Sequence, residues 1–141
     1  MKRKFNKNNG ILIIGGGLLQ SYALKKAKEK KIKVYLVDGS EMCYSKTLAD
    51  KFFKIDIKDH KKVANLTKSL VKNNEINAVY TQGTDVAFTV SYAAKEAGLN
   101  GLDPEVAWAT ENKILMRKIL FDSGIDKTKY MVVSSIEELN D

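Results

Sequence analysis

Stretches with two different patterns of apolar residues alternate along the chain. Uninterrupted apolar runs of four to six residues are typical of buried parallel strands, whereas apolar residues repeated every three or four positions are typical of amphipathic helices. The first pattern predicts strands at residues 11–15 and 33–38, and apolar stretches broken by single polar residues predict strands at about 53–57 and 76–81. The second predicts a first helix after the first strand and further helices over residues 60–72 and 85–97. The first helix should bury Leu19, Ala23, Leu24 and Ala27.

The last third of the sequence continues with helical signals. Asp103 followed by Pro104 is a typical start of a short helix. Another helix should begin at Thr110 or Glu111, end at Gly124, and turn Leu115, Met116, Ile119 and Leu120 inward. Residues 129–133 look like a strand, and Ser134 or Ser135 should cap a turn or two of helix behind it.

Strands and helices that alternate with short connections predict an α/β fold with a doubly wound parallel sheet. Right-handed crossovers favour the strand order 3-2-1-4. In such sheets ligands bind beyond the carboxyl ends of the strands, where the strand order reverses. Here that point lies between strands 1 and 4, so the loops 15–20 and 81–85 should meet there.

The first of these loops, "GGGLLQ", resembles part of a dinucleotide-binding fingerprint. Gly15 and Gly17 occupy the first two glycine positions, Gln20 stands at the third, and Asp38 lies about where an NAD-binding site has its ribose carboxylate. Glycines before a helix offer N–H groups to an anion, although a tight turn needs glycine whatever it binds. An NAD(P)-binding Rossmann domain therefore remains one alternative.

Composition narrows the choice of partners. The net charge is +7, but the lysines gather in stretches without interleaved aromatic residues, so a solvated surface is favoured and no nucleic-acid partner is expected. No apolar run has the length of a membrane span, and no membrane partner is expected. A lone cysteine, Cys43, fits the reducing cytoplasm and lacks a partner for thiol catalysis. No cluster has the spacing of metal ligands, and His60 is interpreted as a surface residue.

Three longer stretches resemble the ATP-grasp superfamily, in chain order. Residues 37–56, "VDGSEMCYSKTLADKFFKID", resemble the segment around the second and third strands of its N-terminal domain. Residues 93–113, "AAKEAGLNGLDPEVAWATENK", resemble a run found in biotin carboxylase and in the large subunit of carbamoyl phosphate synthetase. Residues 109–139 resemble the junction that follows. The departures are Asn112, where Asp is usual, and "TQGTD", where many members have a glutamate-containing loop.

This resemblance implies a Rossmann-like pre-ATP-grasp domain over residues 1–127, with residues 128–141 starting the connection into a further domain. It implies a carboxylate–amine ligase, or one for a thiol or bicarbonate, that works through an acylphosphate. ATP and Mg²⁺ would be bound mainly by that further domain. We therefore expect this chain to be a fragment that is inactive alone, and a homodimer is compatible with the sequence. A non-enzymatic small-ligand sensing module is the third interpretation.

The resemblance and the topology together select the site residues. The small carboxylate or amine substrate should meet the two loops and the end of strand 2, that is Gly15, Gly16, Gly17, Leu18, Gln20, Asp38, Gln82, Gly83 and Thr84. Lys113 matches a basic residue that contacts the nucleotide in several members, and Arg117 follows one turn later. Asp85 could accept from an amine, but it is interpreted first as the cap of the following helix. No catalytic residue and no metal ligand are assigned.

Overall fold

The computed structural model describes residues 9–139 and contains one four-stranded parallel sheet. Its strands are β1 (Gly10–Ile14), β2 (Val34–Asp38), β3 (Lys51–Lys54) and β4 (Ile76–Tyr80). They are arranged in the order β3-β2-β1-β4, with every neighbouring pair parallel. The predicted α/β class and strand order are thus confirmed. The third strand begins and ends earlier than the sequence pattern indicated.

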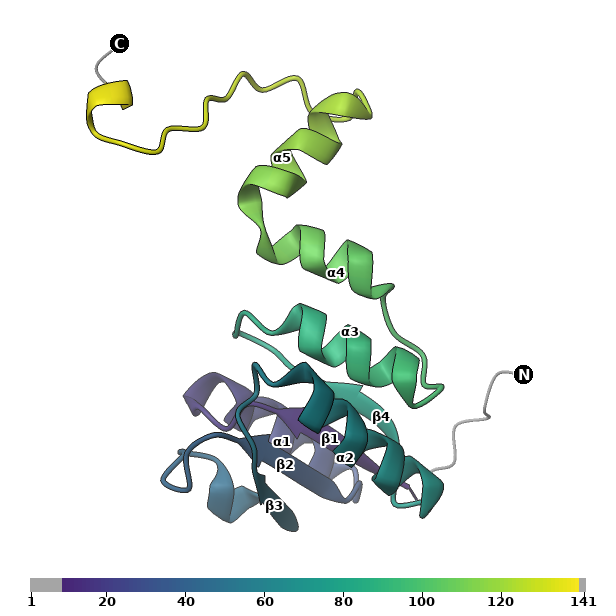
Figure 1. Ribbon diagram of the computed structural model, residues 1–141. Helices are drawn as coiled ribbons and strands as arrows, with labels where there is room; N and C mark the ends of the chain where they lie inside the picture. The colour runs from purple at the N-terminus through teal and green to yellow at the C-terminus, as the bar shows by residue number, and fades with distance from the viewer. Residues whose placement is uncertain (1–8, 140–141) are drawn as a thin grey trace.

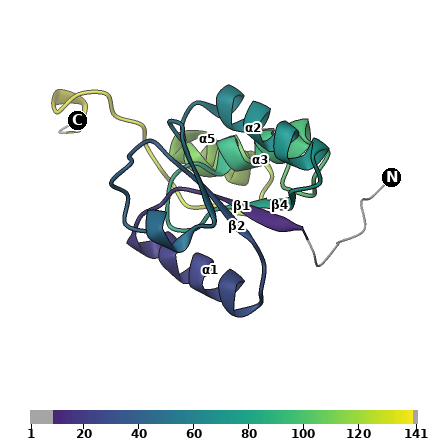
Figure 2. The ribbon, with the colours of Figure 1, turned by 90° about the horizontal axis from the view of Figure 1, so that it is seen from below.

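Helices cover both faces of the sheet (Figure 2). Helix α1 (Leu18–Glu29) lies on one face, and α2 (His60–Lys72) and α3 (Ala87–Glu96) lie on the other. Alternate strand residues therefore enter two separate cores: Leu12 and Val37 pack with α2 and α3, whereas Ile13 and Leu36 pack with α1. This double burial explains why β1 and β2 are apolar throughout.

The chain then leaves the sheet through two further helices (Figure 1). Helix α4 (Pro104–Glu111) packs on α3, and α5 (Lys113–Asp122) follows it. The Asp103 carboxylate accepts a hydrogen bond from the Glu105 backbone N–H at 2.9 Å, which confirms the predicted cap before Pro104. Asn112 ends α4 and caps α5, because its side chain accepts from the Leu115 N–H at 3.0 Å. Helix α5 therefore begins later than Thr110 or Glu111.

Several predictions about buried faces were wrong. None of the α5 residues is fully buried, and Ile119 is 47% exposed, because α5 has α4 rather than the sheet beside it. Leu19 in α1 is 54% exposed, while Gln20 and Ser21 are buried in its place. The sequence period places an apolar stripe on a helix but does not fix its rotation to within one residue.

The C-terminal segment also differs from the prediction. Residues 129–133 form no strand, since no other strand within residues 9–139 lies beside them to complete the backbone pairing. Beyond them, the Ser135 hydroxyl accepts from the Glu138 N–H at 3.3 Å, and the helical part is the single turn Glu137–Leu139. The predicted domain limits include residues 1–8 and 140–141, which lie outside the described residues. The boundary at 127 stays a prediction.

Candidate functional site

The glycine loop after β1 is covered by the protein itself. Gly15 has a φ of +92°, a conformation that favours glycine and turns the chain sharply into α1. The Gly16 N–H donates to the Asp38 carboxylate at 2.7 Å, so Asp38 already has a backbone partner. A Cβ atom placed on Gly16 would lie 2.6 Å from the Cys43 sulfur. The loop that carries Cys43 thus closes over the surface where an anion was expected to approach.

That covering loop is held in place by backbone and side-chain hydrogen bonds. The Ser45 N–H donates to the Gly16 carbonyl at 2.8 Å, and the Ser45 hydroxyl donates to the Gly17 carbonyl at 2.9 Å. Burial, and then the nearby Asp38 carboxylate, raise the pKa of the Cys43 thiol above its usual value. A thiol in this state is protonated and poorly nucleophilic at neutral pH.

Gln20 and Gln82 join the two loops of the predicted site. The Gln20 side-chain amide donates to the Gln82 backbone carbonyl, and the Gln82 side-chain amide donates to the Leu19 carbonyl at 2.6 Å. Gly83, at a φ of +60°, lies so close that an added Cβ would be 2.7 Å from the Leu19 side chain. The predicted meeting of the two loops is therefore present. Their polar groups largely bind one another, and no contact with a ligand is shown.

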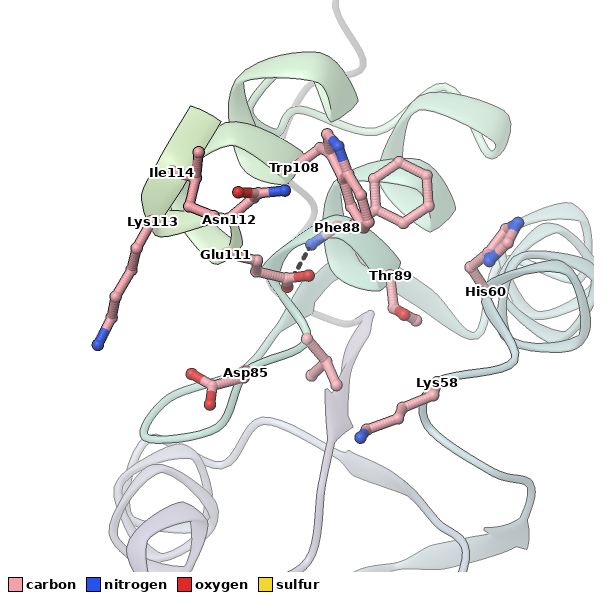
Figure 3. Close-up of a pocket in the computed structure, with 11 residues that line it drawn as sticks. Lys58, His60, Asp85, Phe88, Thr89, Trp108, Glu111, Asn112, Lys113 and Ile114 are labelled. Carbon is pink, nitrogen blue, oxygen red and sulfur yellow. Dashed lines mark hydrogen bonds between the residues drawn. The ribbon is translucent and has the colours of Figure 1, made fainter. Parts of the chain in front are cut away.

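The structure places an open groove immediately beside these loops, at the carboxyl edge of the sheet (Figure 3). We name it the carboxyl-edge groove. Its volume is about 710 Å³. The N-terminal ends of α2, α3 and α5 all contribute to its lining. The lining residues are Lys58, His60, Asp85, Val86, Phe88, Thr89, Trp108, Glu111, Asn112, Lys113 and Ile114.

One wall of the carboxyl-edge groove is aromatic. The Phe88 ring meets the Trp108 ring edge to face, with the ring centroids 5.7 Å apart. His60 makes edge contacts with Phe88 at 5.2 Å and with Tyr92 at 4.9 Å. His60 is therefore part of an aromatic cluster between α2 and α3. The sequence analysis had interpreted it as a surface residue. Trp108 remains 49% exposed, so its ring is accessible from the groove.

The polar side of the groove contains both engaged and free groups. The Glu111 carboxylate accepts from the Phe88 N–H at 2.8 Å and so caps α3 from a distant part of the chain. The prediction that Asp85 caps this helix was wrong. The residue at the cap position is Val86, and the carboxylate that accepts from the first turn of the helix belongs to Glu111. Asp85 instead lies in the loop before α3 and is one of the residues that line the groove (Figure 3).

Four polar side chains on this side have no partner. Among residues 9–139, the side chains of Lys58, Asp85, Thr89 and Lys113 form no hydrogen bond or ion pair. Arg117, by contrast, pairs with Asp126 and does not line the groove. Lys113 thus lies where it can meet a ligand, but its contact with a nucleotide stays a prediction.

Sequence reasoning did not find Lys58, Thr89 or the aromatic wall. They come from three separate segments, and their meeting depends on how α3 and α4 pack. The one signal in the sequence was positional, because Lys58 and Thr89 lie near the starts of helices that follow strand ends. No group of three or more metal-binding side chains occurs within residues 9–139, and no helix there has both the length and the apolar character of a membrane span.

Comparisons with known proteins find solved structures with a similar fold. No family model matches the chain, and no curated protein matches its sequence. Among solved structures, phosphoribosylglycinamide synthetase from Anaerococcus prevotii is 24% identical, with a TM-score of 0.73, over 94% of this chain and 33% of that enzyme. N5-carboxyaminoimidazole ribonucleotide synthetase from Thermotoga maritima is 21% identical, with a TM-score of 0.69, over 92% of this chain and 35% of that enzyme.

A third solved structure also has a similar fold. L-amino acid ligase from Bacillus licheniformis is 16% identical, with a TM-score of 0.71, over 96% of this chain and 41% of that enzyme. All three are ATP-grasp enzymes, and this chain spans only 33% to 41% of their lengths. The expected resemblance is thus confirmed at the level of the fold: this chain has the fold of the N-terminal domain of ATP-grasp enzymes.

Proposed function

We propose that this chain is the N-terminal, substrate-binding domain of a cytoplasmic ATP-dependent ligase of the ATP-grasp type, similar to carbamoyl phosphate synthetase and biotin carboxylase. The fold likeness covers nearly the whole chain and supports this proposal. The observation that carries it is the position of Lys113, which has no ion-pair partner within residues 9–139 and is one of the residues lining an open groove at the carboxyl edge of the sheet. Ligands of doubly wound sheets bind at this edge.

The proposed reaction joins a carboxylate to a nucleophile. ATP, when bound, supplies a phosphoryl group that converts the carboxylate into an acylphosphate and leaves ADP. An amine, or a thiol in some members, then attacks the acyl carbon, phosphate departs, and the nucleophile loses a proton. Bicarbonate can take the place of the organic carboxylate in such ligases.

The residues of this chain would orient and neutralise charge rather than transfer protons. The Lys113 ammonium fits a phosphate oxygen, since a charge-assisted hydrogen bond to phosphate is stronger than a neutral one. The nearby N-terminus of α5 adds its partial positive charge. Mg²⁺ has no matching cluster of side chains within residues 9–139, so no step is assigned to it in this part of the enzyme.

The two loops of the predicted acceptor site have a supporting role in this proposal. Direct substrate contact by Gly15, Gly16, Gly17 or Leu18 stays a prediction, as does contact by Asp38, Gly83 or Thr84. The hydrogen bonds from Gln20 to the Gln82 carbonyl and from Gln82 to the Leu19 carbonyl hold the loop after β4, and that loop continues directly into Asp85. Gln20 would thus position the residue that faces the substrate.

Isotope transfer tests the reaction directly. The longest chain that the gene encodes would be incubated with ATP, Mg²⁺, an amine and carboxylates labelled with a heavy oxygen isotope. We expect ADP release that depends on the carboxylate, with one labelled oxygen transferred to the released phosphate. Residues 1–141 alone should show no turnover. ADP release without label in the phosphate would contradict the acylphosphate route, and no carboxylate-dependent ADP release would contradict the ligase.

A further inference from the structure

Thr89 is the most informative polar residue in the carboxyl-edge groove. It is only 4% exposed, and its hydroxyl forms no hydrogen bond within residues 9–139. The side chain projects into the groove from the first turn of α3 (Figure 3). Among residues 9–139 the only fully enclosed side-chain oxygen without a partner is that of Ser21, so the Thr89 hydroxyl itself stays open to the groove. A polar ligand that enters the groove would supply the missing partner.

The charges around Thr89 have both signs. Lys58 and Lys113 provide two ammonium groups, and Asp85 provides a carboxylate that neither lysine pairs with. A simple anion such as phosphate would be attracted by the lysines but repelled by Asp85. A molecule with both an ammonium group and an anionic group can meet Asp85 and one of the two lysines at once, because its ammonium can face Asp85 while its anion faces that lysine.

The aromatic wall indicates the rest of the ligand. Phe88 and Trp108 lie across the view from Lys58 and Asp85, and Lys113 lies at a third side (Figure 3). Ile114, which is 56% exposed, is a further apolar residue of the groove lining. An apolar or aromatic group placed against these residues would remove apolar surface from water on both partners.

We propose that the carboxyl-edge groove binds a free amino acid with an apolar or aromatic side chain. The Asp85 carboxylate accepts from its ammonium group, Lys58 and the Thr89 hydroxyl bind its carboxylate, and Phe88 and Trp108 contact its side chain. The statement that this amino acid is a substrate rests on the proposed ligase function, whereas the binding site does not. Binding itself needs no ATP.

Calorimetry on the protein without nucleotide tests the proposal. The probes are L-phenylalanine, L-leucine and L-methionine, each compared with derivatives that lack one group. We expect N-acetyl-L-phenylalanine, which has no ammonium, and L-phenylalaninamide, which has no carboxylate, to bind at least about tenfold more weakly than L-phenylalanine. L-Serine, which has no apolar group, should also bind more weakly.

Variants assign the groups to residues. Asp85→Asn should weaken the binding of L-phenylalanine about tenfold and leave the binding of N-acetyl-L-phenylalanine unchanged. Lys58→Met should likewise weaken the binding of L-phenylalanine about tenfold and leave the binding of L-phenylalaninamide unchanged. Thr89→Val should weaken binding, whereas Thr89→Ser keeps the hydroxyl and should restore it. Lys61→Met and Glu105→Gln are the controls, because both residues are exposed and lie outside the groove. Melting curves show whether each variant is folded.

Two results would overturn the proposal. One is no heat of binding with any of the three amino acids, and the other is equal binding of L-phenylalanine and its N-acetyl derivative. The ligase proposal fails separately. Amino-acid binding without carboxylate-dependent ADP release would contradict the ligase alone, and ADP release with other carboxylates but no amino-acid binding would contradict the amino-acid site alone.

Discussion

Gln20 and Gln82 exchange hydrogen bonds across the point where the strand order reverses: each side-chain amide donates to a backbone carbonyl on the other's loop. Gln20 is 4% exposed, so its contact is shielded from water. The position that a dinucleotide-binding fingerprint gives to glycine is used here to tie two loops together.

Replacing Gln20 should destabilise the fold. Gln20→Met keeps the length of the side chain but leaves the Gln82 carbonyl without its donor, which should lower the free energy of unfolding by about 1–3 kcal/mol. Denaturant unfolding followed by circular dichroism measures this change. Gln82→Met is the comparison. Its partner, the Leu19 carbonyl, lies at the surface, where water can replace the donor, so we expect a loss of no more than about 1 kcal/mol. An equal loss in both variants would contradict this assignment.

NAD and NADP should bind poorly. Gln20 occupies the third glycine position, and the Gly16 N–H is already engaged by Asp38, so a pyrophosphate has little free backbone to meet. We expect dissociation constants no better than roughly millimolar, about −4 kcal/mol. Titration calorimetry with each dinucleotide checks this. A low-micromolar constant would favour the dinucleotide-binding alternative over the ATP-grasp interpretation.

A side chain at Gly16 should conflict with Cys43. In Gly16→Ala the new Cβ would lie 2.6 Å from the Cys43 sulfur, and the resulting strain should cost about 1–3 kcal/mol of stability. Cys43→Ala removes that sulfur. The double variant should therefore be more stable than the sum of the two single changes predicts, with a coupling of about 0.5–3 kcal/mol. Additive unfolding free energies would show that the covering loop moves aside without cost.

Lys113→Ala should weaken the use of ATP in the active ligase. A charged hydrogen bond to phosphate contributes about 1.5–3 kcal/mol, so the KM for ATP should rise at least several-fold. Lys118→Ala is a matched control on the same helix, since Lys118 pairs with Asp122 and lies outside the groove. An unchanged KM in Lys113→Ala would assign Lys113 to the solvated surface.

Cys43 should react slowly with alkylating agents. Burial and the Asp38 carboxylate raise the pKa of its thiol, so the reactive thiolate forms only at a higher pH than in an unfolded chain. The contribution of this group to stability is therefore complete below its ordinary pKa and is lost as the pH rises through the raised pKa. Rates of iodoacetamide labelling against pH, for folded and urea-unfolded protein, measure the shift. A midpoint at or below that of the unfolded chain would contradict it.

The strands, and the helices that pack on the sheet, could be predicted from the sequence, because their buried apolar residues recur at a regular spacing. Helix α2 was predicted over residues 60–72 and is found at His60–Lys72, since its apolar stripe meets the sheet directly. Helix α5 also has apolar residues at helical spacing, but the sequence could not show that no sheet lies beneath it. A repeating pattern indicates that a face needs a partner and not which partner it has.

For a related reason, the sequence predicted the meeting of the two loops but not the groove beside them. Strand order fixed the meeting of the loops at residues 15–20 and 81–85, which follows from topology alone. The carboxyl-edge groove depends on the Glu111 carboxylate reaching the Phe88 N–H and on α4 packing against α3. Those contacts join residues far apart in the sequence, and no sequence motif or regular spacing of apolar residues indicates them.

Trp108, the single tryptophan of the sequence, gives the groove its own optical signal. Its indole is half exposed to the groove and rests edge-on against Phe88. Light that excites only tryptophan therefore reports on this groove and on nothing else in the chain. A ligand that displaces water from the indole should shift its emission toward the blue. Occupancy can thus be followed continuously, without a label, while substrates are added in turn and their order of arrival is determined.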